Sequence, residues 1–502
     1  MEQMNPINFK GDFINGEFLK PVKGSGSFTN QSPANLEETV INIKYQYSHV
    51  DDACLSAKRA FREWSERTME ERMEALLKVK GLFEEKREQL AITISRETGK
   101  PLWETATEVN AMIGKFTITF DHSLKLIEEM RLENALPGVD GVIRYRPRGV
   151  MAVLGPFNFP GHLPNGHIVP ALITGNTVVF KPSELTPATG QLMAECYLEA
   201  ELPPGVFNLV HGDGETGRRL AGHKDVDGVL FTGSYETGLK ITEATINDYW
   251  KIRALEMGGK NATVVWNDAD MDKAIYETVI GAFLSAGQRC SCTSKVFVHK
   301  DIANEFTEKF YQRSKKLTIG HWSQNPFMGT LINEKSVNTY LKFQDIALRE
   351  GCEKIMRGKA LETEVRGHYV TPSIYKVKEY DEKSIYQNTE IFGPNVAIYE
   401  ATDMDEVIEM NNSSGYGLAM ALFSKNKDLY EKCLKRAKVG LLNWNRTTNG
   451  ASSRLPFGGY GKSGNDKPSA HFAVYYCTAP VASLEDSTSF DPTKVMPGMN
   501  WD

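Results

Sequence analysis

The sequence predicts an α/β protein with more than one domain. Between residues 151 and 260, short apolar and β-branched runs alternate with stretches long enough to form a helix. A second alternation of this kind runs from about 262 to 440. Such alternation is typical of βαβ units that build a parallel sheet. The length of 502 residues agrees with this prediction, because a domain usually holds roughly 100 to 200 residues.

The composition excludes several classes of protein. The 58 basic and 64 acidic residues leave a net charge of −6, which does not suit a nucleic-acid-binding surface. No apolar run approaches the roughly 18 residues that a membrane span needs. The first residues, MEQMNPINFK, show no secretory signal. We therefore expect a cytoplasmic protein that binds neither nucleic acid nor membrane.

The cysteines do not predict disulfides or a metal. There are seven, an odd number, and they are scattered along the chain. The close pair Cys290 and Cys292 lacks the spacing of a zinc site, and no compact His/Cys group accompanies it. We expect no metal, and one of these thiols is a candidate nucleophile.

The first 130 residues are predicted to be helical after a short polar lead. Apolar residues recur at helical spacing from 51 to 64, which marks one face of a helix. Thr68 and Glu71 have the spacing of a capping box and predict the start of a second helix.

A charged segment at 137–154 predicts an extended, partly exposed hairpin, because Arg144, Arg146 and Arg148 alternate with apolar residues between Gly and Pro. Its charges form either a solvated strand face or a protruding edge that pairs with another subunit. Roughly the last 35 residues are predicted to be extended again and then polar.

The first alternating region predicts strands at 151–154, 177–180, 207–210 and 229–232. Helices at 161–173 and 187–199 lie between them. In such sheets, ligands bind at the carboxyl ends of the strands. The candidate ligand-binding segments therefore directly follow the strands, at 155–158, 181–184, 212–214 and 233–234.

The second alternating region predicts another α/β domain. Strand-like runs occur at 262–266, 295–298 and 397–399, and a helical segment covers 301–316. Neither an internal repeat nor a low-complexity linker marks the boundaries.

Three residues carry groups suited to covalent chemistry. Cys290 follows Arg289, whose charge could lower the thiol pKa but could equally face solvent or a substrate carboxylate. Glu256 lies between two apolar residues, which favours a raised pKa and general-base work. The Asn158 amide could donate to an oxyanion. Taken singly, each residue also fits an ordinary structural role.

Two turns are candidate nucleotide contacts. Lys181 and Glu184 in KPSE could bind the two hydroxyls of a ribose, and a carboxylate at Glu184 favours NAD over NADP because it repels a 2′-phosphate. The Gly-rich turn at 233–238 follows a strand and begins a helix, so it could bind phosphate. Each turn alone is also an ordinary polar loop.

Seven motifs taken in order are more informative: FNFP, KPSE, FTGS, LEMGGK, GQRC, EIFGP and PFGG. This series resembles the aldehyde dehydrogenase superfamily, and the resemblance covers about residues 10 to 480. The resemblance implies a Rossmann-type NAD-binding domain, an α/β catalytic domain and a small β element for bridging and oligomerisation, in a homodimer or a dimer of dimers. The implied ranges are 1–128 and 150–257 for NAD binding, 258–468 for catalysis, and 129–149 and 469–490 for the bridging strands.

The resemblance also implies roles for individual residues. Cys290 is the implied nucleophile, Glu256 the base that activates water, and Asn158 part of the oxyanion hole. The implied NAD-binding residues are Lys181, Ser183, Glu184, Gly233, Ser234, Tyr235, Glu236, Thr237, Gly238, Glu390 and Phe392.

Segments 155–172, 181–187 and 443–465 are most similar to family members that oxidise N-succinyl-L-glutamate 5-semialdehyde in arginine catabolism by the succinyltransferase route. The alternatives are succinic or glutamic semialdehyde, a CoA-acylating reaction, or an inactive binding homologue. Arg446, Thr447 and Lys467 depart from the pattern of these members. The candidate ligands for the substrate carboxylates are Arg289, Arg446, Arg454, His162 and His167.

Overall fold

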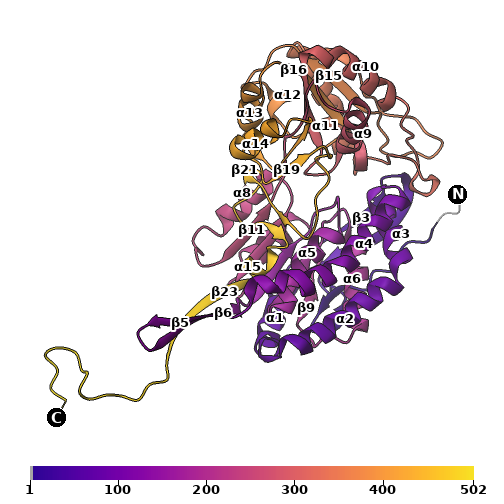
Figure 1. Cartoon of the computed structure of the whole chain (residues 1–502). Helices are drawn as coiled ribbons and strands as arrows, with labels where there is room; N and C mark the ends of the chain where they lie inside the picture. The colour runs from indigo at the N-terminus through magenta and orange to yellow at the C-terminus, as the bar shows by residue number, and fades with distance from the viewer. Residues whose placement is uncertain (1–3, 502) are drawn as a thin grey trace.

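The computed structural model describes residues 4–501 and confirms an α/β fold built on two seven-stranded sheets (Figure 1). The first sheet has the order β11-β10-β7-β8-β9-β1-β2, and its strands from β11 to β9 are parallel. Its strands are β1 (Asp12–Ile14), β2 (Glu17–Leu19), β7 (Val150–Leu154), β8 (Thr177–Lys181), β9 (Phe207–Leu209), β10 (Gly228–Thr232) and β11 (Ile252–Glu256).

Helices cover both faces of the first sheet. One face packs against α1 (Ser48–Glu66), α7 (Gly214–Ala221) and α8 (Tyr235–Ala244). The other face packs against α2 (Met69–Glu85), α3 (Arg87–Thr98), α4 (Leu102–Ile118), α5 (His162–Ile173) and α6 (Pro187–Glu199). The central strands are buried throughout, as expected for a parallel sheet covered on both faces.

The second sheet has the order β14-β15-β16-β13-β12-β18-β19. Its strands are β12 (Asn261–Val265), β13 (Thr293–His299), β14 (Glu353–Met356), β15 (Ser373–Val377), β16 (Asn395–Ala401), β18 (Ala419–Phe423) and β19 (Leu441–Trp444). The main helices of this region are α9 (Met271–Phe283), α10 (Ala303–Ser314), α11 (Glu334–Arg349), α13 (Met404–Asn412) and α14 (Lys427–Arg436). One large apolar core joins these strands and helices.

A third, antiparallel sheet projects from the body of the molecule (Figure 1). It consists of β5 (Met130–Leu136), β6 (Val139–Pro147) and β23 (Thr478–Asp486), in the order β23-β6-β5. Arg144 on β6 forms ion pairs with Glu129 and Glu485 at 2.7 and 2.6 Å. The chain beyond β23 runs away from the body as an extended tail.

The structure corrects three of the local predictions. The segment 137–154 is not one hairpin, because β6 pairs with β5 and β23, whereas β7 joins the first sheet. The polar lead contains strands, including the paired β3 (Gly26–Ser32) and β4 (Asn35–Tyr45). Buried and exposed positions alternate along these strands, but many of the residues are polar, so the sequence does not show the alternation. The predicted extended segment near the C-terminus begins with a short helix, α15 (Ala473–Cys477).

The capping box is confirmed. The Thr68 hydroxyl accepts a hydrogen bond from the Glu71 N–H at 3.2 Å, and Glu71 accepts one from the Thr68 N–H at 2.7 Å. Within residues 4–501, no helix is long and apolar enough to cross a membrane.

Candidate active site

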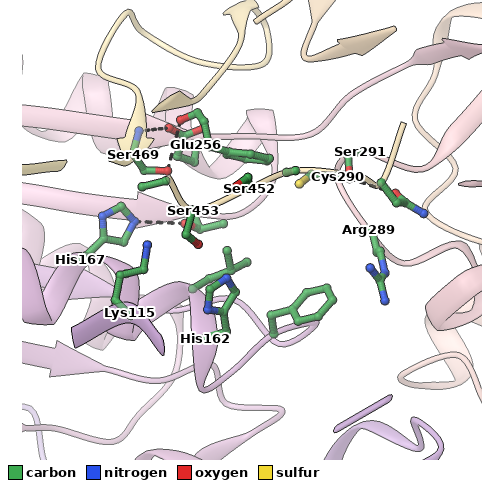
Figure 2. Close-up of a pocket in the computed structure, with 18 residues that line it drawn as sticks. Lys115, His162, His167, Glu256, Arg289, Cys290, Ser291, Ser452, Ser453 and Ser469 are labelled. Carbon is green, nitrogen blue, oxygen red and sulfur yellow. Dashed lines mark hydrogen bonds between the residues drawn. The ribbon is translucent and has the colours of Figure 1, made fainter. Parts of the chain in front are cut away.

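A cavity of about 190 Å³ lies where the two large sheets meet, and its lining combines residues from both parts of the chain (Figure 2). Thr232 and Glu256 end two adjacent strands of the first sheet, whereas Cys290 comes from the loop before β13. The lining residues are Lys115, Phe159, His162, Leu163, Gly166, His167, Thr232, Glu256, Arg289, Cys290, Ser291, Asn449, Ala451, Ser452, Ser453, Phe457, Ser469 and Ala470.

A strained turn delivers Cys290 to this cavity. After α9, Ser285, Ala286 and Gly287 all have positive φ values of 56°, 53° and 70°. Left-handed backbone at residues other than glycine costs about 1–3 kcal/mol each and persists only where the surroundings enforce it. A Cβ at Gly287 would lie 2.3 Å from the Gly393 carbonyl, so this position requires glycine.

The Cys290 backbone is also fixed from the second sheet. Its carbonyl accepts a hydrogen bond from the Asn261 side chain at 2.7 Å. Burial and the nearby carboxylates of Glu390 and Glu256 raise the pKa of the Cys290 thiol. The thiol is therefore protonated in this arrangement, and forming the thiolate requires a proton acceptor.

Cys292 is placed differently. Its sulfur lies 3.8 Å from the Asn449 amide nitrogen and does not line the cavity formed by the described residues. Of the two closely spaced thiols, Cys290 is the one that faces the cavity.

Glu256 ends β11 with its side chain in the cavity. Its Oε1 accepts a hydrogen bond from the Ser469 N–H at 3.1 Å (Figure 2). Its Oε2 is buried and has no hydrogen-bond partner among the described residues. Burial therefore raises the pKa of Glu256 well above its ordinary value. An acceptor oxygen without a partner, on a carboxylate of raised basicity, suits proton abstraction from water.

Asn158 lies beside the loop that carries Cys290. Its amide nitrogen donates to the Gln288 carbonyl at 2.9 Å. Its own carbonyl accepts a hydrogen bond from Lys100 at 2.7 Å, and Lys100 forms a buried ion pair with Glu108 at 2.6 Å. This network holds the Asn158 amide close to the chain segment of the nucleophile.

A larger cavity, of about 760 Å³, lies at the carboxyl ends of β7, β8 and β10. It is lined by Lys181, Ser183, Glu184 and Thr237, all of them predicted NAD-binding residues. Lys181 and Glu184 lie 3.7 Å apart. The strand-end position, the cation–carboxylate pair and the size fit a dinucleotide.

The other predicted residues of the Gly-rich turn belong to the start of α8. The Ser234 hydroxyl caps this helix by accepting from the Thr237 N–H at 3.3 Å. Gly233, Tyr235, Glu236 and Gly238 occupy the same turn and first helical turn. The N–H groups of such a helix start favour a phosphate.

Glu390 and Phe392 lie on a smaller neighbouring pocket. Glu390 accepts a hydrogen bond from the Gly259 N–H at 2.8 Å, and burial raises its pKa to about 7. Phe392 has a φ of 54° and packs edge-on against Phe157, with 5.8 Å between ring centroids.

The predicted role of Arg289 beside the nucleophile needs correction. Arg289 forms an ion pair with buried Glu104 at 2.8 Å, donates to Ser285 at 2.7 Å, and lies over the Phe159 ring. Its charge lowers the pKa of Cys292 and is not among the causes that shift Cys290. Arg289 lines the cavity, but Glu104 already neutralises it.

The other predicted substrate ligands divide into two groups. Arg446 and Arg454 are exposed, and neither is among the described residues that line the cavity. His162 and His167 do line it. The His167 ring lies 2.7 Å from the Tyr476 hydroxyl and 3.3 Å from that of Thr232, whereas Nδ1 of His162 is buried without a partner among the described residues.

Sequence reasoning missed several lining residues, among them Lys115, Asn449, Ser452 and Ser453. Lys115 had a readable signal: it follows Met112 by three positions and Glu108 by seven, so it belongs to the buried face of α4. The Asn449, Ser452 and Ser453 loop has no periodicity, and only the tertiary fold brings it to the cavity.

Comparisons with known proteins agree with the geometry. The model of the aldehyde dehydrogenase family matches residues 22–480. The chain is 39% identical over 493 residues to an N-succinylglutamate 5-semialdehyde dehydrogenase of Paraburkholderia xenovorans, covering 97% of this chain and 99% of the relative. It is 40% identical over 495 residues to an enzyme of that name from Yersinia pseudotuberculosis, covering 98% and 96%.

Solved structures are similar as well. A putative aldehyde dehydrogenase from Burkholderia cenocepacia superposes with a TM-score of 0.91 at 29% identity, covering 98% of this chain and 99% of that chain. A betaine aldehyde dehydrogenase from Staphylococcus aureus in complex with NAD⁺ superposes with a TM-score of 0.90 at 28% identity, covering 97% and 96%.

Proposed function

This chain belongs to the aldehyde dehydrogenase family, and on that premise we propose that it oxidises N-succinyl-L-glutamate 5-semialdehyde to N-succinyl-L-glutamate with NAD. The observation that carries the proposal is the single cavity that holds Cys290 and Glu256 together. The substrate follows from the relatives of that name, which match the chain over almost its whole length.

Cys290 is the proposed nucleophile. Its sulfur attacks the aldehyde carbon, and the product is a thiohemiacetal on the enzyme. Because burial keeps the thiol protonated in this arrangement, its proton must pass to water before or during the attack.

Asn158 and the Cys290 N–H are the proposed oxyanion donors. The negative charge that develops on the aldehyde oxygen needs donors fixed before the reaction. The Asn158 amide meets that condition, since its backbone is anchored by Lys100 and its amide donates to the neighbouring Gln288 carbonyl in this structure.

The cavity at the strand ends is the proposed NAD site. Lys181 and Glu184 would hold the adenosine ribose, the start of α8 the pyrophosphate, and Glu390 with Phe392 the nicotinamide side. When bound, NAD supplies the hydride acceptor for oxidation of the aldehyde to the level of a carboxylic acid. Glu184 disfavours the 2′-phosphate of NADP by charge repulsion.

Glu256 is the proposed base for the second half of the reaction. It takes a proton from water, the oxygen attacks the Cys290 thioester, and the carboxylic acid leaves as the sulfur is released. Overall, aldehyde, NAD⁺ and water give carboxylate, NADH and two protons. A hydrolytic base would be superfluous in a CoA-acylating enzyme.

A single assay tests the proposal. NADH formation is followed with succinylglutamic, glutamic, succinic and simple aliphatic aldehydes, with and without CoA. We expect the highest kcat/KM for the succinylglutamic semialdehyde and no dependence on CoA. A preference for uncharged aldehydes, or a requirement for CoA, would contradict the proposal.

We also propose a homodimer or a dimer of dimers that works in the cytoplasm. Edge strand β5 exposes Met130, Leu132 and Leu136 to about half of their full area, with relative exposures of 50%, 51% and 50%, and an exposed apolar edge favours pairing with a second copy. All seven cysteines are free, which fits a reducing compartment. Light scattering coupled to size exclusion measures the assembly.

A further inference from the structure

We propose that Lys115 determines substrate specificity by binding a carboxylate of the substrate inside the catalytic cavity. This inference rests on the proposed function, because it assumes an acidic aldehyde. Lys115 belongs to α4, and no motif of the sequence pointed to it.

Lys115 is a buried cation without a counter-charge. Its relative exposure is 2%, and within residues 4–501 its ammonium has neither an ion-pair partner nor a hydrogen-bond acceptor. A lysine is almost never fully buried unless it is paired, because moving its charge out of water is costly. Burial accordingly lowers the pKa of Lys115 to about 8.

Other buried lysines of this chain show the ordinary arrangement. Lys100 pairs with Glu108, Lys260 donates to the carbonyls of Tyr386 and Thr389, and Lys295 donates to two carbonyls in the last turn of α13. Each of these ammonium groups is satisfied from within the protein. Lys115 differs from them, and it is also the one that lines the catalytic cavity.

The surroundings of Lys115 are suited to an anion. In Figure 2 its ammonium lies between the rings of His162 and His167, on the side of the cavity away from Arg289. Gly166 lies beside the Lys115 side chain, and a Cβ at this position would make ordinary van der Waals contact with it, 3.9 Å from the ammonium nitrogen. Nδ1 of His162 is a second buried polar atom without a partner among the described residues.

A carboxylate would satisfy these groups together. Its charge would neutralise Lys115, and its second oxygen could accept from His162 or from the hydroxyls of Ser452 and Ser453, which line the same cavity. Arg289 is the other strong cation of the lining, but Glu104 already neutralises it. Among the described residues that line the cavity, Lys115 is therefore the cation that remains available to bind the carboxylate of an acidic substrate.

The test compares Lys115→Met with the parent and with Lys125→Met, which makes the same chemical change at an exposed position outside the cavity. Steady-state kinetics use N-succinylglutamate semialdehyde and hexanal. We expect Lys115→Met to lower kcat/KM for the acidic aldehyde about ten- to a hundredfold, mainly through KM. The value for hexanal should change less than about threefold, and Lys125→Met should match the parent.

A second readout does not need turnover. The product N-succinyl-L-glutamate should inhibit the parent competitively, and its inhibition constant should rise by the same factor in Lys115→Met. Removing an unpaired buried charge should leave the melting temperature equal or higher. If the Met variant does not fold, Lys115→Gln replaces it, since glutamine also removes the charge.

The outcomes separate this inference from the proposed function. Equal losses of kcat/KM on both aldehydes in Lys115→Met would overturn the role of Lys115, and so would unchanged selectivity with normal product inhibition. In either case, a parent enzyme that prefers the succinylated substrate would still support the proposed function. A parent that prefers another acidic aldehyde, with selectivity lost in Lys115→Met, would support Lys115 and overturn the named substrate. A parent that prefers hexanal would overturn both.

Discussion

Replacing Glu256 by glutamine separates the two halves of the proposed reaction. Glutamine keeps the shape of the side chain, and its Oε1 can still accept the Ser469 N–H. The change removes the basic oxygen that is buried without a partner in the described structure. Formation of the Cys290 thioester does not need a base for water, whereas its hydrolysis does.

The expected loss of rate in Glu256→Gln follows from this role as a base. Loss of a general base slows the dependent step about 10²- to 10⁴-fold, which corresponds to roughly 3 to 5 kcal/mol of activation free energy. Steady-state NADH formation should therefore fall by that factor. The first turnover should remain and release one NADH for each active Cys290.

The same substitution should stabilise the fold at neutral pH. Burial raises the pKa of Glu256 above its unfolded value, so the folded state favours the protonated carboxyl. Ionisation of the folded group therefore costs stability as pH rises above the unfolded pKa. Glu256→Gln should melt at a higher temperature than the parent, by a margin that grows from pH 5 to pH 8, whereas the exposed control Glu74→Gln should show no such trend.

Rapid mixing followed by mass spectrometry of the quenched enzyme checks the reasoning. A burst of NADH together with acyl adduct on Cys290 is the expected result. Normal steady-state turnover would remove Glu256 from the mechanism. Loss of the burst itself would show that Glu256 acts earlier, as the acceptor of the Cys290 proton.

Three further predictions concern neighbouring groups. Cys290→Ala should abolish turnover and Cys292→Ala should retain most of it, since only Cys290 faces the described cavity; adduct mapping by mass spectrometry would contradict this if it found the acyl group on Cys292. Glu184→Ala should raise the NADP-to-NAD ratio of kcat/KM by relieving charge repulsion, and equal use of both cofactors by the parent would refute the reasoning. The ratio of kcat/KM for the acidic aldehyde to kcat/KM for the neutral aldehyde should fall as pH rises through about 8, because Lys115 loses its charge there. His162 and His167 have pKa values of about 3 and stay neutral over this range. Titration of Glu256 affects both substrates alike, so a ratio that does not change with pH would count against Lys115.

The parts of the fold that follow local periodicity could be predicted from the sequence. Strands β7, β8, β9 and β10 lie where continuous apolar runs placed them, because a covered parallel sheet needs such runs. The pair β3 and β4 could not be recognised in the same way, since its solvent-facing residues conceal the alternation. The short helix α15 is too brief for a periodicity to show.

The residues of the candidate site also divide into those that the sequence could predict and those that depend on the tertiary fold. Motif order predicted Cys290, Glu256 and Asn158 without a structure, and the structure places Cys290 and Glu256 in the lining of one cavity. The ion pair of Arg289 with Glu104 joins residues 185 positions apart, so no local pattern could have shown that Arg289 is already neutralised. Exposure of Arg446 likewise depends on the tertiary fold.

The cavity keeps the Lys115 ammonium and the Glu256 carboxyl, neither of which has an ion-pair partner among the described residues, apart from each other, and the proposed chemistry depends on that separation. No ion pair joins Lys115 to Glu256 within the described residues, and neither group shifts the pKa of the other. The His167 ring lies within hydrogen-bond distance of the Thr232 hydroxyl, and Thr232 is the strand partner of Glu256 in β10 and β11. The uncharged His167 ring therefore lies on the side of Lys115 that faces Glu256. Direct contact would lower the basicity of the carboxylate and occupy the ammonium. Separated, Glu256 remains a strong base for water while Lys115 remains free for an acidic substrate.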